Sequence, residues 1–337
     1  MPSIKLMEIC GTHTMSIARN GIKALLPKDV SLVSGPGCPV CVTPAAVIDS
    51  VLELAMEKNV IISTYGDMVR VPGSTPGDNL SRRRALGAAI DIVYSPIDAL
   101  ETARRNPGKE VVFLGVGFET TAPGTAAAVL SARAEGLENF SLFSMLKTCE
   151  GAVKTLMAMP GFCIDGFLLP GHVATIIGQK GFEYLDIPGV IAGFEAEDIK
   201  LAIKDLLKLI EKGENRVLND YPRAVSYEGN RLAQRVMEEC FEPCESEWRG
   251  LGTIPGSGLQ LREELSEFDA VKKFSVEKKE GRQSACRCGD VITGKISPEQ
   301  CPLFGKRCTP DEPVGPCMVS SEGACAAAYK YGDIWKI

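Results

Sequence analysis

Short apolar runs alternate with amphipathic runs through the first two thirds of the chain, and this alternation restricts the fold more than any other feature. Val60–Thr64 is apolar and rich in β-branched residues, and a loop with Gly and Pro follows it. Ala196–Lys212 has the periodicity of an amphipathic helix. Strands that alternate with helices are typical of parallel sheets. We therefore predict an α/β fold of parallel sheets, with functional loops after the carboxyl ends of the strands.

The predicted elements cover most of the chain up to residue 239. The Gly- and Pro-rich stretch 250–258 is predicted to be a loop, and the charged stretch 268–281 is predicted to be exposed. The predicted strands are 4–9, 30–33, 60–64, 91–94, 111–116, 142–146, 164–169 and 190–192. The predicted helices are 15–26, 44–58, 81–89, 96–105, 125–135, 151–159, 174–179, 196–212 and 229–239.

Two breaks in the pattern divide the chain into three predicted domains. Asn106 opens a turn-rich break that contains Pro and Gly, and the composition changes again from about Gly213. A chain of 337 residues is long enough for two or three domains. We predict a first α/β domain over 1–106, a similar second α/β domain over 107–213, and a smaller third domain over 214–337.

The charge of the chain argues against some classes of partner. A net charge of −6, with no basic block longer than the three arginines at 82–84, argues against binding to nucleic acid or to an anionic membrane. The N-terminus leads into no apolar stretch of signal-peptide length, and no uninterrupted apolar run is long enough to span a membrane. We expect a soluble, cytoplasmic protein.

The chain contains thirteen cysteines, which are too many for packing alone in a compartment where structural disulfides are disfavoured. Cys10, Cys38 and Cys41 lie near the start, and six further cysteines fall within 286–325. This distribution indicates two sites with metal or redox chemistry.

The Cys-x-x-Cys pair of Cys38 and Cys41 lies between an apolar run and a predicted helix. Thr43 and Pro44 fit the N-cap and the first position of that helix. Unpaired N–H groups and the helix dipole at an N-terminus favour a thiolate, so the pair is a candidate redox dithiol. The spacing alone is also compatible with half of a zinc site, or with two thiols that only pack.

Cys10 and His13 form a further candidate site on the loop after the first strand, or in the first turn of a helix. Both residue types bind metals, and at this spacing they are within reach of one metal ion. The chain has only two histidines, so a histidine beside a cysteine favours a site. The alternative is a surface histidine next to a buried thiol.

Polar residues also follow predicted strands elsewhere in the chain. Glu119, His172 and Glu195 each come directly after a strand, so they are candidates to face one cleft in acid–base roles. The two glutamates are also compatible with charges at helix starts, where the dipole favours them. Asp67 and Arg70 follow an earlier strand and could order their loop or contact a ligand.

Wide spacing between the C-terminal cysteines favours an iron–sulfur cluster. Structural zinc sites usually contain closely spaced pairs of cysteines, whereas the four main candidates here are separated by twelve, six and sixteen residues. We predict a [4Fe–4S] cluster, with zinc as the alternative. The candidate ligands are Cys288, Cys301, Cys308 and Cys325, with Cys286 or Cys317 as substitutes.

Several motifs resemble those of the HypD family of hydrogenase maturation proteins, in the same order and over nearly the whole chain. Such a set is far more specific than a single Cys-x-x-Cys pair. The motifs are MEICGTHT at 7–14, GPGCPVCVTP at 35–44, TYGDM at 64–68, GFETTAP at 117–123, LPGH at 169–172, CPLFGK at 301–306 and MVSSEGAC at 318–325.

The resemblance implies two similar α/β domains and a third domain that carries a cluster. It also implies a scaffold on which the Fe(CN)₂CO unit of [NiFe]-hydrogenase is assembled with the small chaperone HypC, while HypE delivers cyanide as a thiocyanate. By position, Cys10 would bind the iron with His13 beside it, and Cys38 and Cys41 would be the redox dithiol. The C-terminal cysteines would hold the cluster.

The expected function is therefore that of a redox-active maturation scaffold. Release of cyanide from a thiocyanate requires two electrons, and a dithiol that becomes a disulfide supplies two. A cluster carries one electron at a time and would reduce the disulfide again. Two other classes of function are a zinc-stabilised interaction scaffold without chemistry of its own, and a thiol–disulfide reductase that works on proteins without bound iron.

Overall fold

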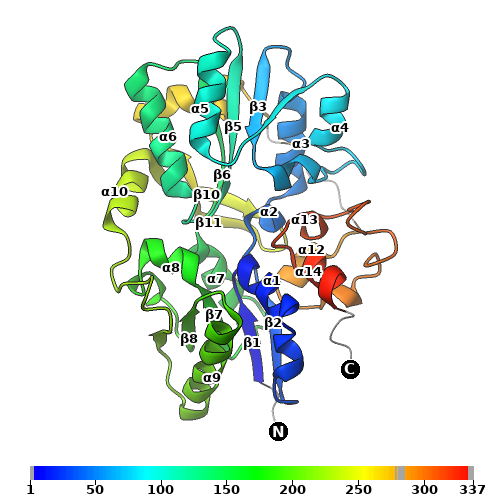
Figure 1. Cartoon of the computed structure of the whole chain (residues 1–337), viewed down its shortest axis with the longest axis vertical. Coiled ribbons are helices and arrows are strands. Elements are labelled where there is room, and N and C mark those ends of the chain that lie inside the picture. Colours follow the sequence, from blue (N-terminus) through cyan, green and yellow to red (C-terminus); the bar gives the residue numbers. More distant parts are fainter. Residues whose placement is uncertain (1–3, 278, 280–284, 333–337) are drawn as a thin grey trace.

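The computed structural model describes residues 4–277, 279 and 285–332, and in this part of the chain it shows two parallel β-sheets (Figure 1). The larger sheet has the strand order β2-β1-β7-β8-β9, and the smaller has the order β4-β3-β5-β6. All neighbouring strands in both sheets are parallel. The predicted α/β fold class is therefore confirmed.

Most predicted strands lie within a few residues of observed ones, and the predicted bounds of β3 are those observed. A short antiparallel hairpin of β10 and β11 is separate from both sheets. The strands are β1 (Ile4–Glu8), β2 (Val30–Ser34), β3 (Val60–Thr64), β4 (Ala89–Ile92), β5 (Glu110–Gly117), β6 (Phe140–Leu146), β7 (Gly166–Pro170), β8 (Gly189–Ala192), β9 (Val217–Asn219), β10 (Phe241–Trp248) and β11 (Gly252–Leu261).

Helices connect the strands, and the predicted bounds of α5 and α9 are those observed. The α-helices are α1 (Gly11–Arg19), α2 (Pro39–Val42), α3 (Ala45–Leu54), α4 (Leu80–Ala85), α5 (Pro96–Arg105), α6 (Ala122–Glu135), α7 (Cys149–Met157), α8 (Gly171–Ile177), α9 (Ala196–Lys212), α10 (Arg231–Cys240), α11 (Ala270–Lys273), α12 (Cys288–Ile292), α13 (Pro316–Val319) and α14 (Ala324–Tyr331). Short 3₁₀ turns are η1 (Ile22–Leu25), η2 (Gly66–Arg70), η3 (Lys180–Phe182), η4 (Glu263–Phe268) and η5 (Pro298–Gln300).

The α9 helix shows how the sequence pattern becomes structure. Its apolar residues Ile199, Ile203 and Leu206 recur at helical spacing and are buried against β7 and β8. It ends where Gly213 takes a left-handed φ of 67°, a conformation that costs glycine little. The apolar stripe therefore positions the helix on the larger sheet.

The strand pairing corrects the predicted domain boundaries. The segment 1–106 supplies β1 and β2 to the larger sheet but β3 and β4 to the smaller one. The segment 107–213 likewise supplies β5 and β6 to the smaller sheet, and β7 and β8 to the larger one. The turn signals near Asn106 mark the chain reversal between α5 and β5. These turn signals do not show which strands pair. The strand after the turn, β5, pairs with β3, which precedes it.

The third predicted segment, 214–337, is also only partly separate. Its β9 strand completes the larger sheet, and β11 packs on α7 and β6. The predicted loop at 250–258 is wrong, because most of it forms β11, where Gly252 and Gly256 take positive φ values within an irregular hairpin. The predicted exposure of 268–281 is wrong at its start, since Phe268 is buried, and residues 278 and 280–281 lie outside the described part.

The C-terminal segment, from α12 to α14, lies against the side of the molecule beside α1 and α2 (Figure 1). Its helices are short and separated by turns. A small C-terminal unit is therefore compatible with the prediction, although it begins well after residue 214. Among the described residues, no helix combines the length and apolar character needed to cross a membrane.

The topology predicts that the isolated segment 1–106 does not fold cooperatively. In that fragment β1 would lack its neighbour β7 and β3 would lack its neighbour β5, so one hydrogen-bonding edge of each strand would be unpaired. We expect circular dichroism to show no cooperative thermal transition in the fragment, with the full chain as the control. A sharp transition in the fragment would contradict the shared-sheet topology.

Candidate metal and redox site

Cys38 and Cys41 lie at the start of α2, a single helical turn that precedes α3. Cys38 is the N-cap of α2, Pro39 occupies its first position, and the Cys41 N–H donates to Cys38 Sγ at 3.2 Å. The two sulfur atoms are joined in a disulfide, with the Cα atoms 5.2 Å apart. The predicted helix cap is corrected, because Pro44 is the N-cap of α3 and Thr43 Oγ1 donates to the Pro39 carbonyl oxygen at 2.9 Å. The pair is at a helix N-terminus as predicted, but that helix is α2.

Cys10 packs its backbone against the disulfide loop, which comprises residues 35–41. Cys10 is the buried N-cap of α1. Gly37 lies so close that a Cβ atom there would be 2.2 Å from Cys10 N. The Gly11 N–H donates to the Gly37 carbonyl oxygen at 3.1 Å. The structure therefore brings Cys10 next to the Cys38–Cys41 pair. The two backbones cross so closely at Gly37 that a side chain at this position would not fit.

The Cys10 thiol lies at the N-terminus of α1 but is cut off from solvent. Burial raises the pKa of Cys10 to about 12, although hydrogen bonds from the backbone N–H groups of His13 and Thr12 lower it. Cys10 is therefore a protonated thiol at neutral pH. A metal ion that binds its sulfur must displace this proton.

Glu8 lies directly beneath Cys10 and was missed in the sequence analysis. Its Oε2 accepts the Cys10 N–H at 3.1 Å and its Oε1 accepts Thr14 Oγ1 at 2.5 Å. Burial raises the pKa of Glu8 to about 7. The signal available was a carboxylate at the end of a strand that otherwise contains one charged residue, two residues before a candidate metal-binding cysteine.

The two histidines of the chain lie on either side of Phe194. The ring centroid of His13 is 5.0 Å from that of Phe194, and the ring of His172 stacks on Phe194 at 3.8 Å. His13 Nε2 lies 2.8 Å from the Gly193 carbonyl oxygen, and within the described residues His13 Nδ1 has no hydrogen-bond partner. Burial lowers the pKa of His13 to about 4 and also lowers that of His172. The structure brings the two predicted histidines together as neutral rings.

Glu119 reaches the N-terminus of α7, where it meets Cys149. Its Oε1 accepts the Cys149 N–H at 2.8 Å, and its Oε2 has no partner in the part of the chain that is described. Burial raises the pKa of Glu119. Burial, then the charges of Glu119 and Cys10, raise the pKa of Cys149, so Cys149 lies within electrostatic reach of Cys10. Sequence analysis missed Cys149, although its position directly after β6 was an available signal.

The other predicted loop residues have structural partners. Glu195 is the exposed N-cap of α9, which favours the helix-start alternative. Asp67 Oδ2 accepts the backbone N–H of Ser321 at 2.9 Å and its hydroxyl at 2.8 Å. Arg70 Nη2 donates to the Pro310 carbonyl oxygen at 2.5 Å. Asp67 and Arg70 therefore tie η2 to the C-terminal segment.

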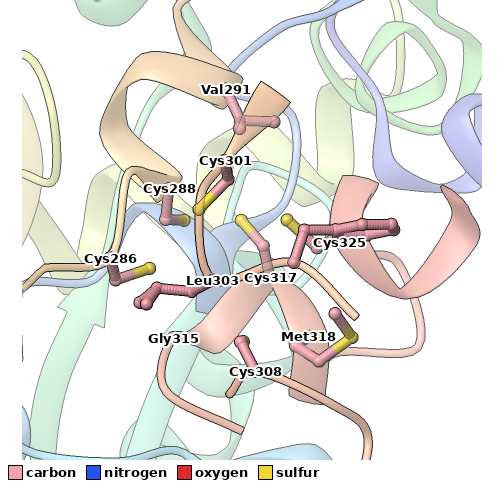
Figure 2. A pocket seen from close by; sticks show the side chains of 11 residues that line it. Cys286, Cys288, Val291, Cys301, Leu303, Cys308, Gly315, Cys317, Met318 and Cys325 are labelled. Atoms are coloured by element: carbon pink, nitrogen blue, oxygen red, sulfur yellow. The ribbon is translucent and has the colours of Figure 1, made fainter. Parts of the chain in front are cut away.

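The six C-terminal cysteines line one small cavity, here called the cysteine cavity (Figure 2). Apolar side chains such as Val291, Leu303 and Met318 complete its wall. No three His, Cys, Asp or Glu side chains within the described ranges converge as the ligands of a single metal ion do. The six cysteines are Cys286, Cys288, Cys301, Cys308, Cys317 and Cys325.

Several sulfur atoms of the cysteine cavity contact one another or backbone N–H groups. Hydrogen bonds with the thiols of Cys288 and Cys325, followed by burial, raise the pKa of Cys317. The Val314 N–H donates to Cys308 Sγ at 3.4 Å. All four predicted cluster ligands and both substitutes therefore share one cavity, and the geometry does not separate ligands from substitutes.

The cysteine cavity and the disulfide loop touch each other at two points. Cys288 Sγ lies 3.9 Å from the Cys41 carbonyl oxygen. Cys38 Sγ lies 3.3 Å from Ser320 Oγ, on the turn that follows α13. The disulfide loop thus contacts the Cys10 backbone through Gly37, and the C-terminal segment through Cys38 and Cys41.

Two side chains that the sequence analysis did not single out form long-range hydrogen bonds near the disulfide loop and Cys10. Arg249, at the turn of the β10–β11 hairpin, donates from Nε and Nη2 to the Thr43 carbonyl oxygen at 3.1 and 2.9 Å. Glu322 accepts a hydrogen bond from Thr12 Oγ1 at 2.5 Å, one turn from Cys10. Glu322 lies within the motif at 318–325, but the sequence does not show its contact with Thr12, because the two residues are far apart in the chain.

Known proteins resemble this chain over almost its full length. It matches the family described as "HypD: Hydrogenase formation hypA family" over residues 1–332. It is 47% identical to the hydrogenase expression/formation protein HupD of Azotobacter chroococcum mcd 1, over 97% of this chain and 89% of the relative. The hydrogenase maturation factors HypD of Rhodobacter capsulatus and Escherichia coli (strain K12) are 45% and 43% identical, over 98% and 97% of this chain and 89% of each relative.

The crossing of Gly37 over Cys10 predicts that Gly37→Ala is destabilising. An added Cβ would meet backbone atoms, which cannot swing aside as a flexible side chain can. We expect the free energy of unfolding in denaturant to fall by about 1–3 kcal/mol. Gly108→Ala is the matched control, because nothing lies within 4 Å of the position of its Cβ. Equal stability of the two variants would show that the crossing is not tight.

Proposed function

This chain belongs to the HypD family of hydrogenase maturation factors, and from this premise we propose that it is the scaffold and redox component for assembling the Fe(CN)₂CO unit of [NiFe]-hydrogenase. In this proposal Cys10 binds the iron together with the chaperone HypC, and HypE supplies cyanide as a thiocyanate. The Cys38–Cys41 pair supplies the electrons that release it. The protein acts as a redox-active assembly scaffold.

One observation carries this proposal: three sulfur sites meet at a single loop. Gly37 touches the backbone of Cys10, Cys38 contacts Ser320, and the Cys41 carbonyl oxygen contacts Cys288. An isolated structural thiol pair would need no such neighbours. Their adjacency supports a site at which iron capture and electron transfer are coupled.

Iron capture at Cys10 is coupled to loss of its proton. The thiol is protonated at neutral pH because it is buried, so Fe²⁺ binding forms the iron–sulfur bond and releases H⁺. Backbone N–H groups of Thr12 and His13 then stabilise the remaining charge on the thiolate. His13 Nδ1, which has no hydrogen-bond partner within the described part of the chain, would orient a ligand of the iron three positions along the sequence from Cys10.

Cyanide release balances if the dithiol is the reductant. A thiocyanate R–S–C≡N and the two thiols of Cys38 and Cys41 give R–SH, the disulfide and HCN. The S–CN bond breaks, the disulfide bond forms, and the two thiol protons go to the released thiol and to cyanide. The disulfide between Cys38 and Cys41, with Cα atoms 5.2 Å apart, supports this step, because it is the oxidised product that the step requires.

The residues of the cysteine cavity fit an iron–sulfur cluster. Iron–sulfur clusters are held by cysteine thiolates, and this cavity is lined by six cysteines and apolar side chains. Cys288, Cys301, Cys308 and Cys325 would hold the cluster, with Cys286 or Cys317 as substitutes. When bound, it would supply single electrons beside the disulfide.

Loss of either thiol of the pair should abolish cyanide transfer to iron. In the complex with HypC, we expect Cys38→Ala and Cys41→Ala each to lose the infrared bands of iron-bound cyanide, because neither variant can form the disulfide. Cys163→Ala is the matched control, since Cys163 is exposed and distant in sequence from the site. Bands of normal intensity in either variant would refute the dithiol role.

Metal analysis of anaerobically purified protein tests the cysteine cavity. We expect about four irons and four sulfides per chain with a visible iron–sulfur absorption, and loss of both in Cys301→Ala. Bound zinc without sulfide would instead favour the interaction scaffold. Turnover of protein disulfides without any bound iron would favour the thiol–disulfide reductase.

A further inference from the structure

A line of polar side chains leads from the sulfur of Cys38 to a partly exposed carboxylate. Ser320 is buried, and its Oγ lies 3.3 Å from Cys38 Sγ and 3.3 Å from Asp67 Oδ2. The Glu322 N–H donates to the same oxygen at 3.2 Å. Because that N–H occupies one lone pair of the oxygen, the hydroxyl hydrogen is directed toward the sulfur or the carboxylate. Ser320 therefore joins the two groups.

The carboxylate end of this line is held in place. Asp67 Oδ2 also accepts the backbone N–H and the hydroxyl of Ser321, at 2.9 and 2.8 Å. Asp67 belongs to η2, which follows β3, whereas Ser320 and Ser321 follow α13. Two segments distant in the sequence thus meet at this carboxylate. Asp67 remains partly open to solvent, so it can exchange protons with water.

Redox chemistry at the Cys38–Cys41 pair requires protons to leave and enter the site. Oxidation of two thiols to a disulfide removes two electrons and two protons, and reduction returns them. The exposed fraction is 6% for Cys38 and 0% for Cys41, so water reaches neither sulfur freely. An electron carrier moves no protons. A chain of hydrogen-bonded protein groups would therefore carry the proton of Cys38 away from a sulfur that water reaches only slightly.

We propose that Ser320 and Asp67 form the proton path of Cys38, an inference that rests on the redox role of the dithiol given above. When the pair is oxidised, the Cys38 thiol gives its proton to Ser320 Oγ while the Ser320 hydroxyl gives its own to Asp67. The S–H bond of Cys38 breaks and the Cys38–Cys41 S–S bond forms, while the electron pair goes to the thiocyanate of the proposed function or, in the test below, to diamide. Asp67 passes its proton to water, and water protonates the reduced acceptor. The same path runs in reverse when the disulfide is reduced. Cys41 loses its proton separately.

Other charged groups lie near this path but do not replace it. Burial raises the pKa of Glu322, and the charge of Asp67 raises it further. The carboxyl of Glu322 is engaged by Thr12 Oγ1 at 2.5 Å. Arg70, on the same 3₁₀ turn as Asp67, donates to the Pro310 carbonyl oxygen. Asp67 is the carboxylate within hydrogen-bond distance of Ser320.

The test follows oxidation of the reduced full chain by diamide, which accepts two electrons and two protons from two thiols. Disulfide formation between Cys38 and Cys41 is measured anaerobically after acid quenching, by peptide mass spectrometry, in H₂O and in D₂O. We expect Ser320→Ala to slow the reaction about tenfold or more and to lose the solvent isotope effect. Ser320→Thr keeps a hydroxyl and should restore both. Asp67→Asn should slow the reaction as well.

Ser50→Ala is the matched control for loss of a buried hydroxyl. Ser50 lies on α3 and donates to the Glu277 carbonyl oxygen at 3.1 Å, without contact to the pair. Its oxidation rate should equal that of the unchanged protein. An unchanged rate and isotope effect in Ser320→Ala would overturn the proposal, and so would slowing that Ser320→Thr does not reverse.

The proton path and the proposed maturation function fail in different ways. The rate of diamide oxidation tests the proton path without iron, HypC or thiocyanate. The intensity of the infrared bands of iron-bound cyanide tests the proposed maturation function. If the bands persist in Cys38→Ala while Ser320→Ala still slows diamide oxidation, the dithiol role in cyanide transfer is lost and the proton path stands.

Discussion

The backbone crossing of Gly37 over Cys10 is the contact on which the rest of the site depends. It holds the start of α1 against the disulfide loop at a distance that leaves no room for a Cβ atom. The loop in turn meets the C-terminal cysteines through Cys41 and Ser320. Two backbones, rather than two flexible side chains, set the separation between Cys10 and the disulfide loop, and the proposed coupling of iron capture to redox chemistry depends on that separation.

Burial gives the groups around Cys10 an unusual protonation pattern. Burial raises the pKa values of Cys10, Glu8, Glu119 and Cys149, whereas it lowers that of His13. Burial therefore favours the neutral forms of these groups. A metal cation reverses this balance, because it favours the deprotonated forms. The proton path from Cys38 to Asp67 fits the same need on the other side of the loop.

Much of the local structure follows from the sequence, whereas the strand pairing does not. The bounds of β3, α5 and α9 were predicted because apolar periodicity, Pro at a helix start and Gly at a helix end are local signals. The domain boundaries were wrong because β1 pairs with β7 and β3 with β5. The strands β1 and β7 are more than a hundred residues apart in the sequence. No turn signal predicts either of these two pairings. The Gly-rich β11 was missed because its partner strand, β10, supplies the hydrogen bonds that define it.

The sequence by itself determined membership of the HypD family through its ordered motifs, and its thirteen cysteines supplied the residue types on which the proposed metal and redox chemistry rests. Only the tertiary structure decided how the sites are combined. It placed Glu8 beside Cys10, gathered six cysteines around one cavity, and set Ser320 between Cys38 and Asp67. The physical reason is that residue types fix reactivity, whereas proximity and burial arise from packing between segments distant in the chain.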